Sequence, residues 1–218
     1  MKKLIFAFIL TAIASAYAMA QATTDYKKTE FFVGYSNGQV DTGVDSGSSV
    51  NSFLEDRANF HGFNASGVYN VSRYFGLKAD VSGTYNKTRF SFPVTTGSTT
   101  QTVSFDTDNS LYNFLGGVQV KDNASDARFK PFAHALIGAG HARTKVKNVI
   151  CTTTATITCT DIGVRDSETG LAGAFGGGLD IKINDKLDFR AFQVDYNPMR
   201  LNGGTDHNVR IGIGIVFK

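Results

Sequence analysis

The amino-acid sequence predicts an all-β protein, an eight-stranded antiparallel up-and-down transmembrane β-barrel. Three observations support this fold class. Apolar residues alternate with small or polar residues in eight separate runs, and the connections between the runs are alternately short and long. Glycine (23 residues) and phenylalanine (18) are frequent and proline (3) is rare, which favours sheet. No internal stretch is apolar for long enough to predict a membrane-spanning helix.

The N-terminus has the basic, apolar and small-residue regions of a secretory signal peptide in their usual order. Lys2 and Lys3 precede an apolar run, and small residues follow at Ala18-Met19-Ala20. Cleavage after Ala20 predicts a signal peptide over residues 1–20, a short N-terminal segment over 21–28 and a barrel domain over 29–218. Cleavage after Ala18 fits almost as well. An N-terminal membrane anchor is the alternative, but the apolar run is too short to span a bilayer.

The first four strands separate their side chains into two distinct faces. We expect these strands over residues 29–38, 62–71, 75–86 and 110–120. One face carries Phe, Tyr, Leu and Val, as at Phe31, Val33 and Tyr35, and the other carries Gly, Ser, Asn, Thr and isolated charges. The repeated alternation predicts a sheet with one apolar face and one polar face.

The last four strands are less regular. They are expected over residues 131–143, 169–182, 187–196 and 209–218. The facing of the first is ambiguous, because both of its faces carry small residues. In the run over 187–196 the alternation changes phase, and a β-bulge near Phe192–Gln193 would account for the change.

The connections alternate in length along the chain. Short ones are expected at residues 71–74, 121–129 and 183–186, and longer polar ones at residues 40–56, 93–108, 145–167 and 197–208. All short turns and both ends of the mature chain should therefore lie at one end of the barrel, with the long loops at the other. Membrane barrels of bacteria have short periplasmic turns and long exterior loops.

An eight-stranded meander can also be a soluble, lipocalin-like barrel. A soluble barrel places its large apolar side chains inside, around a ligand, and its charges outside. Here the face rich in Gly, Ser and Asn would make a poor apolar core, but it suits the crowded interior of a narrow barrel. We therefore expect the apolar face to contact lipid. The barrel must then close, because unpaired backbone groups in hydrocarbon are costly.

The stretches "FFVGYSNG", "YFGLKADVSGTY", "FRAFQVDYNP" and the terminal "GIGIVF" resemble those of small outer-membrane β-barrel proteins. The chain is similar to the outer membrane protein A-type and X-type class, in particular to stand-alone barrels without a periplasmic domain. The resemblance implies a bacterial outer-membrane location, with long loops exterior and both mature termini periplasmic. The implied partners are outer-membrane lipid and, during biogenesis, periplasmic chaperones and the barrel-assembly machinery. Neither the resemblance nor the near-neutral net charge of +3 indicates a nucleic-acid partner.

The same resemblance assigns a role to the last strand. In such proteins a terminal aromatic residue, with apolar residues at every second position before it, is read by the assembly machinery. The matching residues are Val209, Ile211, Ile213, Ile215 and Phe217. Lys218 departs from the commonest ending. On the other face, Gly212 and Gly214 are expected to make room in a packed lumen.

Charged residues on the polar face are expected to project into the lumen. They are Glu30, Lys78, Asp80, Arg190, Asp195 and Arg210. Isolated charges in a low-dielectric interior are costly, so opposite charges should pair. Arg190 and Asp195 are an odd number of residues apart and can both face inward only if the bulge is present. The network would form either an ion path or a plug, and we expect a plug because the barrel is narrow.

The remaining candidate residues are cysteines and histidines. Cys151 and Cys159 lie in the longest connection, and their spacing suits a disulfide that closes a small loop in an oxidising compartment. The four histidines, at positions 61, 134, 141 and 207, lack the spacing of metal ligands. We expect no metal, no cofactor and no catalytic residues.

The sequence predicts a structural or surface-interaction protein, anchored by its barrel and exposing long loops. The polar lumen leaves a second interpretation open, a small pore or channel for ions or small solutes. An outer-membrane enzyme that modifies lipids or peptides is the third. The partner of the exterior loops is unknown from the sequence.

Overall fold

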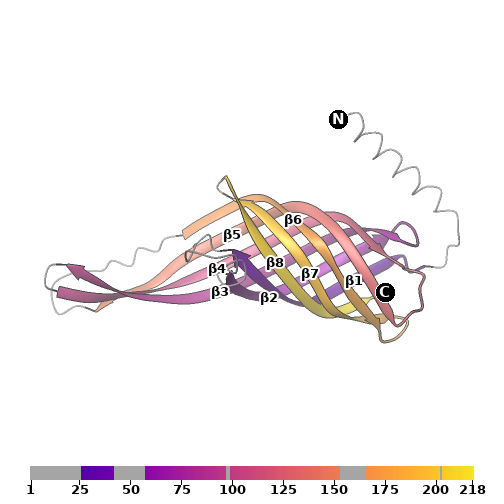
Figure 1. Cartoon of the computed structure of the whole chain (residues 1–218), viewed down its shortest axis with the longest axis horizontal. Coiled ribbons are helices and arrows are strands. Elements are labelled where there is room, and N and C mark those ends of the chain that lie inside the picture. Colours follow the sequence, from indigo (N-terminus) through magenta and orange to yellow (C-terminus); the bar gives the residue numbers. More distant parts are fainter. Residues whose placement is uncertain (1–25, 42–56, 97–98, 153–164, 202) are drawn as a thin grey trace, which may run out of the picture.

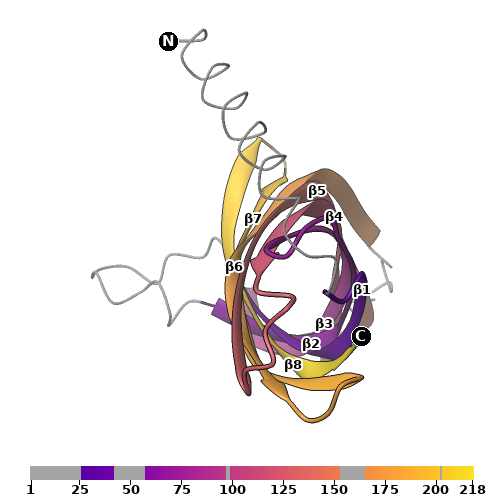
Figure 2. The same cartoon turned by 90° about the vertical axis from the view of Figure 1, so that its right-hand side faces the viewer.

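The computed structural model describes residues 26–41, 57–96, 99–152, 165–201 and 203–218. These residues form eight strands: β1 (Thr29–Asp41), β2 (Arg57–Asn70), β3 (Phe75–Thr96), β4 (Thr99–Lys121), β5 (Phe129–Thr152), β6 (Arg165–Lys182), β7 (Leu187–Leu201) and β8 (Gly204–Phe217). Each strand pairs antiparallel with the next, and β8 pairs with β1, which closes the barrel (Figure 1). Figure 2 shows the ring of strands nearly end on. The predicted fold is confirmed.

The expected signal peptide over residues 1–20 lies outside the described residues. Within the described residues, no helix has the length and apolar character needed to cross a membrane.

The outer surface of the barrel is apolar, as the alternation predicts. On β1, Phe31, Val33 and Tyr35 are 59%, 57% and 46% exposed, whereas Phe32 and Ser36 on the inner face are at most 2% exposed. Strands β2 to β8 also each carry exposed large hydrophobic residues, among them Phe63, Leu77, Phe114, Ile137, Phe175, Val194 and Ile213. A continuous apolar exterior on a closed sheet is the arrangement that a lipid bilayer requires.

The prediction of a loop over residues 93–108 is wrong. β3 runs to Thr96 and β4 begins at Thr99, so this segment forms a long hairpin that projects from one end of the barrel (Figure 1). The connections expected over 145–167 and 197–208 are shortened in the same way, because β5 runs to Thr152 and β8 begins at Gly204. Polar Thr- and Ser-rich composition suggested loops, but threonine favours strands and serine can hydrogen-bond across a strand pair, as Ser91 and Ser104 do at 2.9 Å.

Cross-strand contacts hold the hairpin together beyond the barrel. Arg89 donates to both carboxylate oxygens of Asp106, at 2.7 and 3.0 Å. The rings of Phe90 and Phe105 stack on the opposite face, with centroids 5.4 Å apart. β5 pairs with this hairpin as far as Thr152, so the projection is a sheet of three strands.

A β-bulge lies where the change of phase predicts one. The registers of β7 with both neighbours shift between Arg190 and Gln193, where two β7 residues, Ala191 and Phe192, oppose one residue of β8. Because the bulge adds one residue, Arg190 and Asp195 both face the lumen and are at most 1% exposed. The structure also decides the facing of β5, which sequence alone left ambiguous. Its even-numbered residues from Lys130 to Leu136 point inward.

The seam between β1 and β8 depends on two opposed glycines. Gly34 and Gly214 are partners in the register. A Cβ atom at Gly214 would collide with the carbonyl oxygen of Val33, and one at Gly34 would collide with that of Ile213. The ring of Phe32 also lies against both glycines. These positions admit only glycine without displacement of the backbone or the ring.

The expectation that Gly212 also makes room in the lumen is wrong. A Cβ atom there would lie 3.6 Å from its nearest neighbour, the carbonyl oxygen of Tyr35, which is an ordinary van der Waals distance.

We predict that Gly214→Ala lowers the stability of the folded barrel by about 1–3 kcal/mol, the usual cost of overpacking. The measurement is urea unfolding in detergent, followed by the heat-modifiable mobility of the folded form in gels. Gly212→Ala is the matched control on the same strand and should leave the unfolding midpoint close to that of the wild type. Equal effects of the two substitutions would contradict this account of the seam.

Candidate functional site

The lumen is where charged side chains are concentrated, and it holds all six charged residues selected from the sequence. Glu30, Lys78, Asp80, Arg190, Asp195 and Arg210 are each at most 3% exposed. An eight-stranded barrel is only wide enough to be filled by side chains. Which charges lie next to one another therefore determines what the lumen can do.

One group of charges lies near the short-turn end of the barrel. Lys121 donates to both carboxylate oxygens of Glu30, at 3.0 and 2.9 Å, and to Asp180 at 2.9 Å. Asp180 also accepts from Arg190, at 2.8 and 3.2 Å. Neither Lys121 nor Asp180 was among the residues expected to form the network. In the described part of the chain, Lys121 and Asp180 connect Glu30 to Arg190.

The guanidinium group of Arg190 contacts two aromatic rings. It lies 4.4 Å from the ring centroid of Phe32 and 4.0 Å from that of Phe132. Cation–π contacts of this kind strengthen when water is excluded. Arg190 also donates to Gln193 at 2.8 Å, and Gln193 donates to Asp195 at 2.7 Å. Gln193 therefore links the first group of charges to a second.

The second group centres on Arg210. Its Nη2 lies 2.7 Å from Asp195 and its Nη1 lies 2.7 Å from Asp80, so one guanidinium joins two carboxylates from β7 and β3. Ser82 and Asn64 complete the surroundings: Arg210 donates to Ser82 at 3.0 Å, and Asn64 donates to Asp80 at 2.9 Å. A guanidinium suits this role because its donors are arranged in a rigid planar fork.

Lys78 is placed differently from the other five residues. Among the described residues, no carboxylate lies within ion-pair distance of its ammonium group. Its Nζ lies 3.3 Å from Nδ1 of His134, whose Nε2 lies 2.9 Å from Asp195. Lys78 thus reaches the network through a histidine. His134 was left out of the expected network, because the facing of β5 was ambiguous in the sequence.

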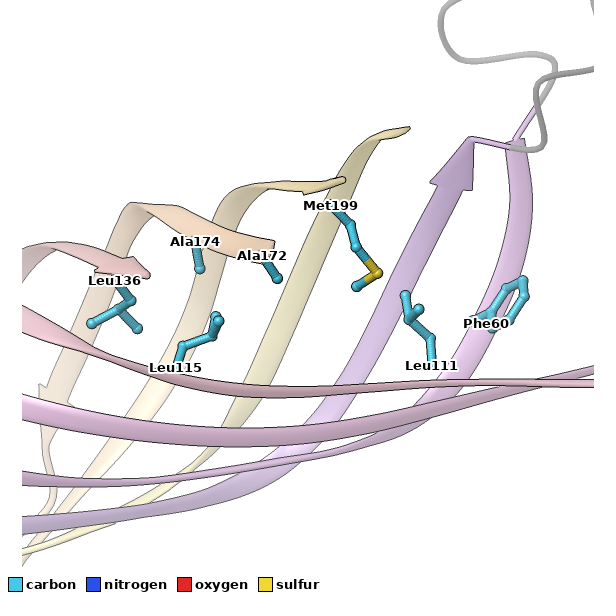
Figure 3. Close-up of a cluster of buried hydrophobic side chains, with 7 residues drawn as sticks. All are labelled: Phe60, Leu111, Leu115, Leu136, Ala172, Ala174 and Met199. Carbon is cyan, nitrogen blue, oxygen red and sulfur yellow. The ribbon is translucent and has the colours of Figure 1, made fainter. Parts of the chain in front are cut away.

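Toward the long hairpins the lumen contains apolar side chains beside buried polar ones such as Asn113 and Asn197, which corrects the expectation of a polar lumen throughout. The apolar side chains form a buried cluster (Figure 3). Its members are Phe60, Leu111, Leu115, Leu136, Ala172, Ala174 and Met199. Sequence alternation did place Leu115 on the inner face. The facing of Leu136 was ambiguous in the sequence, and Met199 lies beyond the expected end of its strand. The lumen therefore contains a polar plug followed by an apolar one.

At the short-turn end the lumen opens into a cavity of about 550 Å³. The buried Lys121–Glu30 pair forms part of its wall. Asp122 lies at its rim, where a hydrogen bond from the Arg73 guanidinium holds the pKa of the Asp122 carboxyl group below its usual range. Through Lys121 and Glu30 the wall of this cup joins the ion-pair network.

The other sequence-selected residues lie outside the lumen. The predicted disulfide cannot be placed, because Cys159 lies outside the described residues and Cys151 lies at the end of β5. The terminal-strand residues all belong to β8 and face outward, with Ile211, Ile213 and Phe217 at 42%, 42% and 48% exposed. Among the described residues, no group of three or more His, Cys, Asp or Glu side chains could hold a metal ion.

Two of the missed charges had a signal in the sequence. Asp180 lies between outward-facing Leu179 and Ile181, so its inward direction follows from parity alone. Lys121 continues the inward parity of Asn113 and Gln119, but it was assigned to the turn after the strand. Asp180 lies within the strand expected over residues 169–182, and Lys121 lies one residue beyond the strand expected over 110–120.

We predict that Arg210→Ala destabilises the barrel by about 3–5 kcal/mol, because it leaves two carboxylates buried without their shared cation. Arg210→Lys should cost less, since an ammonium keeps the charge but not the planar fork. Urea unfolding in detergent measures both. Arg73→Ala removes an exposed ion pair and is the control, expected to change stability little. If Arg210→Ala unfolded at the wild-type urea concentration, the network would not be stabilising.

Comparison with known proteins identifies the type of barrel. The model of the outer membrane protein beta-barrel domain matches residues 6–217. Similar solved structures include Ail, the attachment invasion locus protein of Yersinia pestis (19% identity, 87% of this chain, 97% of that chain, TM-score 0.46). Neisserial surface protein A (13%, 88%, 97%, TM-score 0.48) and OprG from Pseudomonas aeruginosa (12%, 88%, 96%, TM-score 0.42) are also similar. No curated protein matches the chain. Because the family model covers nearly the entire sequence, the chain belongs to the outer membrane protein beta-barrel domain family and is a small bacterial outer-membrane barrel.

Proposed function

We propose that this protein is a non-conducting, non-catalytic outer-membrane barrel that acts as a structural and surface-interaction protein through its exterior end. The observation that carries the proposal is the double plug in the lumen. The ion-pair network closes the polar half, and the cluster around Leu136 and Met199, which are at most 1% exposed, closes the other half. A permeating ion would have to displace both.

Opening the polar plug would cost much free energy. Moving Arg210 away from Asp80 and Asp195 would leave two carboxylates unpaired in a closed space, and Arg190 is held by two rings as well as by Asp180. Each group is connected to the next through Lys121, Gln193 or His134. A local rearrangement of one side chain would therefore break several charge-assisted contacts.

The three-stranded projection supports an interaction role. It extends the barrel at the long-loop end with polar side chains such as Arg89, Asp106 and Lys147 on one face. We propose that this end is exterior and that both mature termini are periplasmic, as the lengths of the connections favour. The partners we propose are outer-membrane lipid and, during biogenesis, the barrel-assembly machinery and periplasmic chaperones.

Planar-bilayer recording tests the closed lumen. We expect the purified, folded protein to give no reproducible conductance steps. A suitable positive control is a variant that weakens both plugs, Arg210→Ser combined with Met199→Ser, which should conduct if it remains folded. Reproducible steps from the wild type would favour the alternative function, a small pore for ions or small solutes, over a plugged barrel.

A second prediction concerns the last strand. Phe217→Ala should lower the amount of folded protein in cells more than it lowers the stability of the folded barrel, because one partly exposed side chain contributes at most about 1.5–3 kcal/mol. Heat-modifiable mobility of outer-membrane fractions measures the first quantity, and refolding of the purified protein into detergent measures the second. Val216→Asp is the contrasting variant, since Val216 is 1% exposed and faces the lumen. It should impair stability in both assays. Normal cellular levels of folded Phe217→Ala would contradict the proposed assembly role.

A further inference from the structure

The outer face of β5 and β6 changes abruptly from apolar to basic toward the projecting end. Ile137 and Leu171 are 59% and 58% exposed and belong to the lipid-facing surface. Further along β5, on the same face, lies His141, which hydrogen-bonds to Thr169 at 2.8 Å. Arg143 and Lys145 come next at every second position. The lipid-facing surface thus ends in a polar pair and then in cations.

These cations form a cluster, which we call the exterior basic cluster: Arg143, Lys145 and Lys147 of β5 and Arg165 of β6. Lys145 and Arg165 are direct cross-strand partners. Lys145 is repelled most strongly by Arg143, and also by Lys147 and Arg165. Like charges placed directly opposite each other destabilise a sheet. The pairing of Lys145 with Arg165 is therefore not explained by a gain in the stability of the sheet.

The cluster has an excess of positive charge. Lys147 is paired with Asp108, with Nζ 2.6 Å from the carboxylate. In the part of the chain that the structure describes, Arg143, Lys145 and Arg165 form no ion pair with a carboxylate. Asp108 is also the cross-strand partner of Lys145 and attracts it, so one carboxylate faces four cations and an excess of positive charge remains on this outward face.

The position of the cluster indicates which groups these are. It lies directly beyond the lipid-facing surface, so its side chains extend at the depth of lipid headgroups. Long basic side chains lie along apolar surface and place their charged ends at this level. Phosphate is the anion that headgroups offer there, and guanidinium groups bind phosphate through two parallel hydrogen bonds.

We propose that the exterior basic cluster is a binding site for the phosphate of a membrane lipid headgroup, with Arg143, Lys145 and Arg165 as its ligands. The proposal rests on the proposed function in one respect: the proposed orientation makes the exterior leaflet the source of the lipid. A bound phosphate would relieve the repulsion between Lys145 and Arg165 and would fix the depth of β5 and β6 in the bilayer. Lipid would then be a specific partner of this barrel rather than only its solvent.

The test is lipid retention by the full-length mature protein, folded in detergent and titrated with phosphatidic acid. Native mass spectrometry counts the lipid molecules bound. The test variant is Arg143→Gln/Lys145→Gln/Arg165→Gln. The control variant, Lys27→Gln/Lys28→Gln/Lys186→Gln, removes three exposed charges from the opposite end of the barrel. Phosphatidylcholine and inorganic phosphate are the control ligands.

We expect the wild type and the control variant to retain phosphatidic acid, and the test variant to bind it at least tenfold more weakly, since each cation near a membrane surface contributes severalfold to binding. Inorganic phosphate should not displace the lipid. Equal losses in both variants, unchanged binding in the test variant, or full displacement by inorganic phosphate would overturn the proposal. Gel mobility verifies folding, and Lys145→Gln against Lys186→Gln repeats the comparison with single substitutions.

The orientation is tested separately, by protease treatment of intact cells. Cleavage within the projecting hairpin is expected if that end is exterior. A failure there would contradict the proposed orientation but would leave the detergent binding result unaffected, so the two failures are distinguishable.

Discussion

Closure of the sheet is the constraint on which the rest of the structure depends. In hydrocarbon every backbone N–H and C=O group must be paired, and only the contact of β1 with β8 removes the last free edges. That contact requires the opposed glycines Gly34 and Gly214, since a side chain at either position would collide with the neighbouring backbone. Closing eight strands also makes the interior narrow. The inward-facing side chains must then pack against one another.

The charge network is a consequence of that narrowness. Inward charges cannot reach water through the ring of strands, so most of them pair with an opposite charge inside it, and Lys78 reaches the network through His134. Arg210 joins carboxylates of two strands, and Arg190 contacts two aromatic rings while it binds Asp180. The bulge in β7 belongs to the same solution, because without the extra residue Asp195 would point into lipid. Packing, register and electrostatics are therefore coupled in this half of the barrel.

The two ends of the barrel have different chemistry. The short-turn end has a cup whose wall includes the Lys121–Glu30 pair, whereas the projecting end has an apolar plug inside and an excess of cations outside. This asymmetry favours a protein that acts at its projecting surface and at the surrounding lipid rather than through its lumen. The excess charge of the exterior basic cluster is the clearest sign of such a role. In the lipid site proposed above, a headgroup phosphate would neutralise these cations.

The sequence by itself determined the eight strands, their order and, in every strand except β5, most of the residues on the apolar face, because alternation with a period of two is a local property of each strand. It also determined that Arg190 and Asp195 require a bulge. The tertiary structure alone decided the partners: that Lys121 and Asp180 connect Glu30 to Arg190, and that His134 stands between Lys78 and Asp195. These contacts join strands far apart in the chain, and their register depends on closure. The hairpin beyond Asn86 was likewise decided by pairing, since its polar residues become strand only when a neighbour supplies the hydrogen bonds.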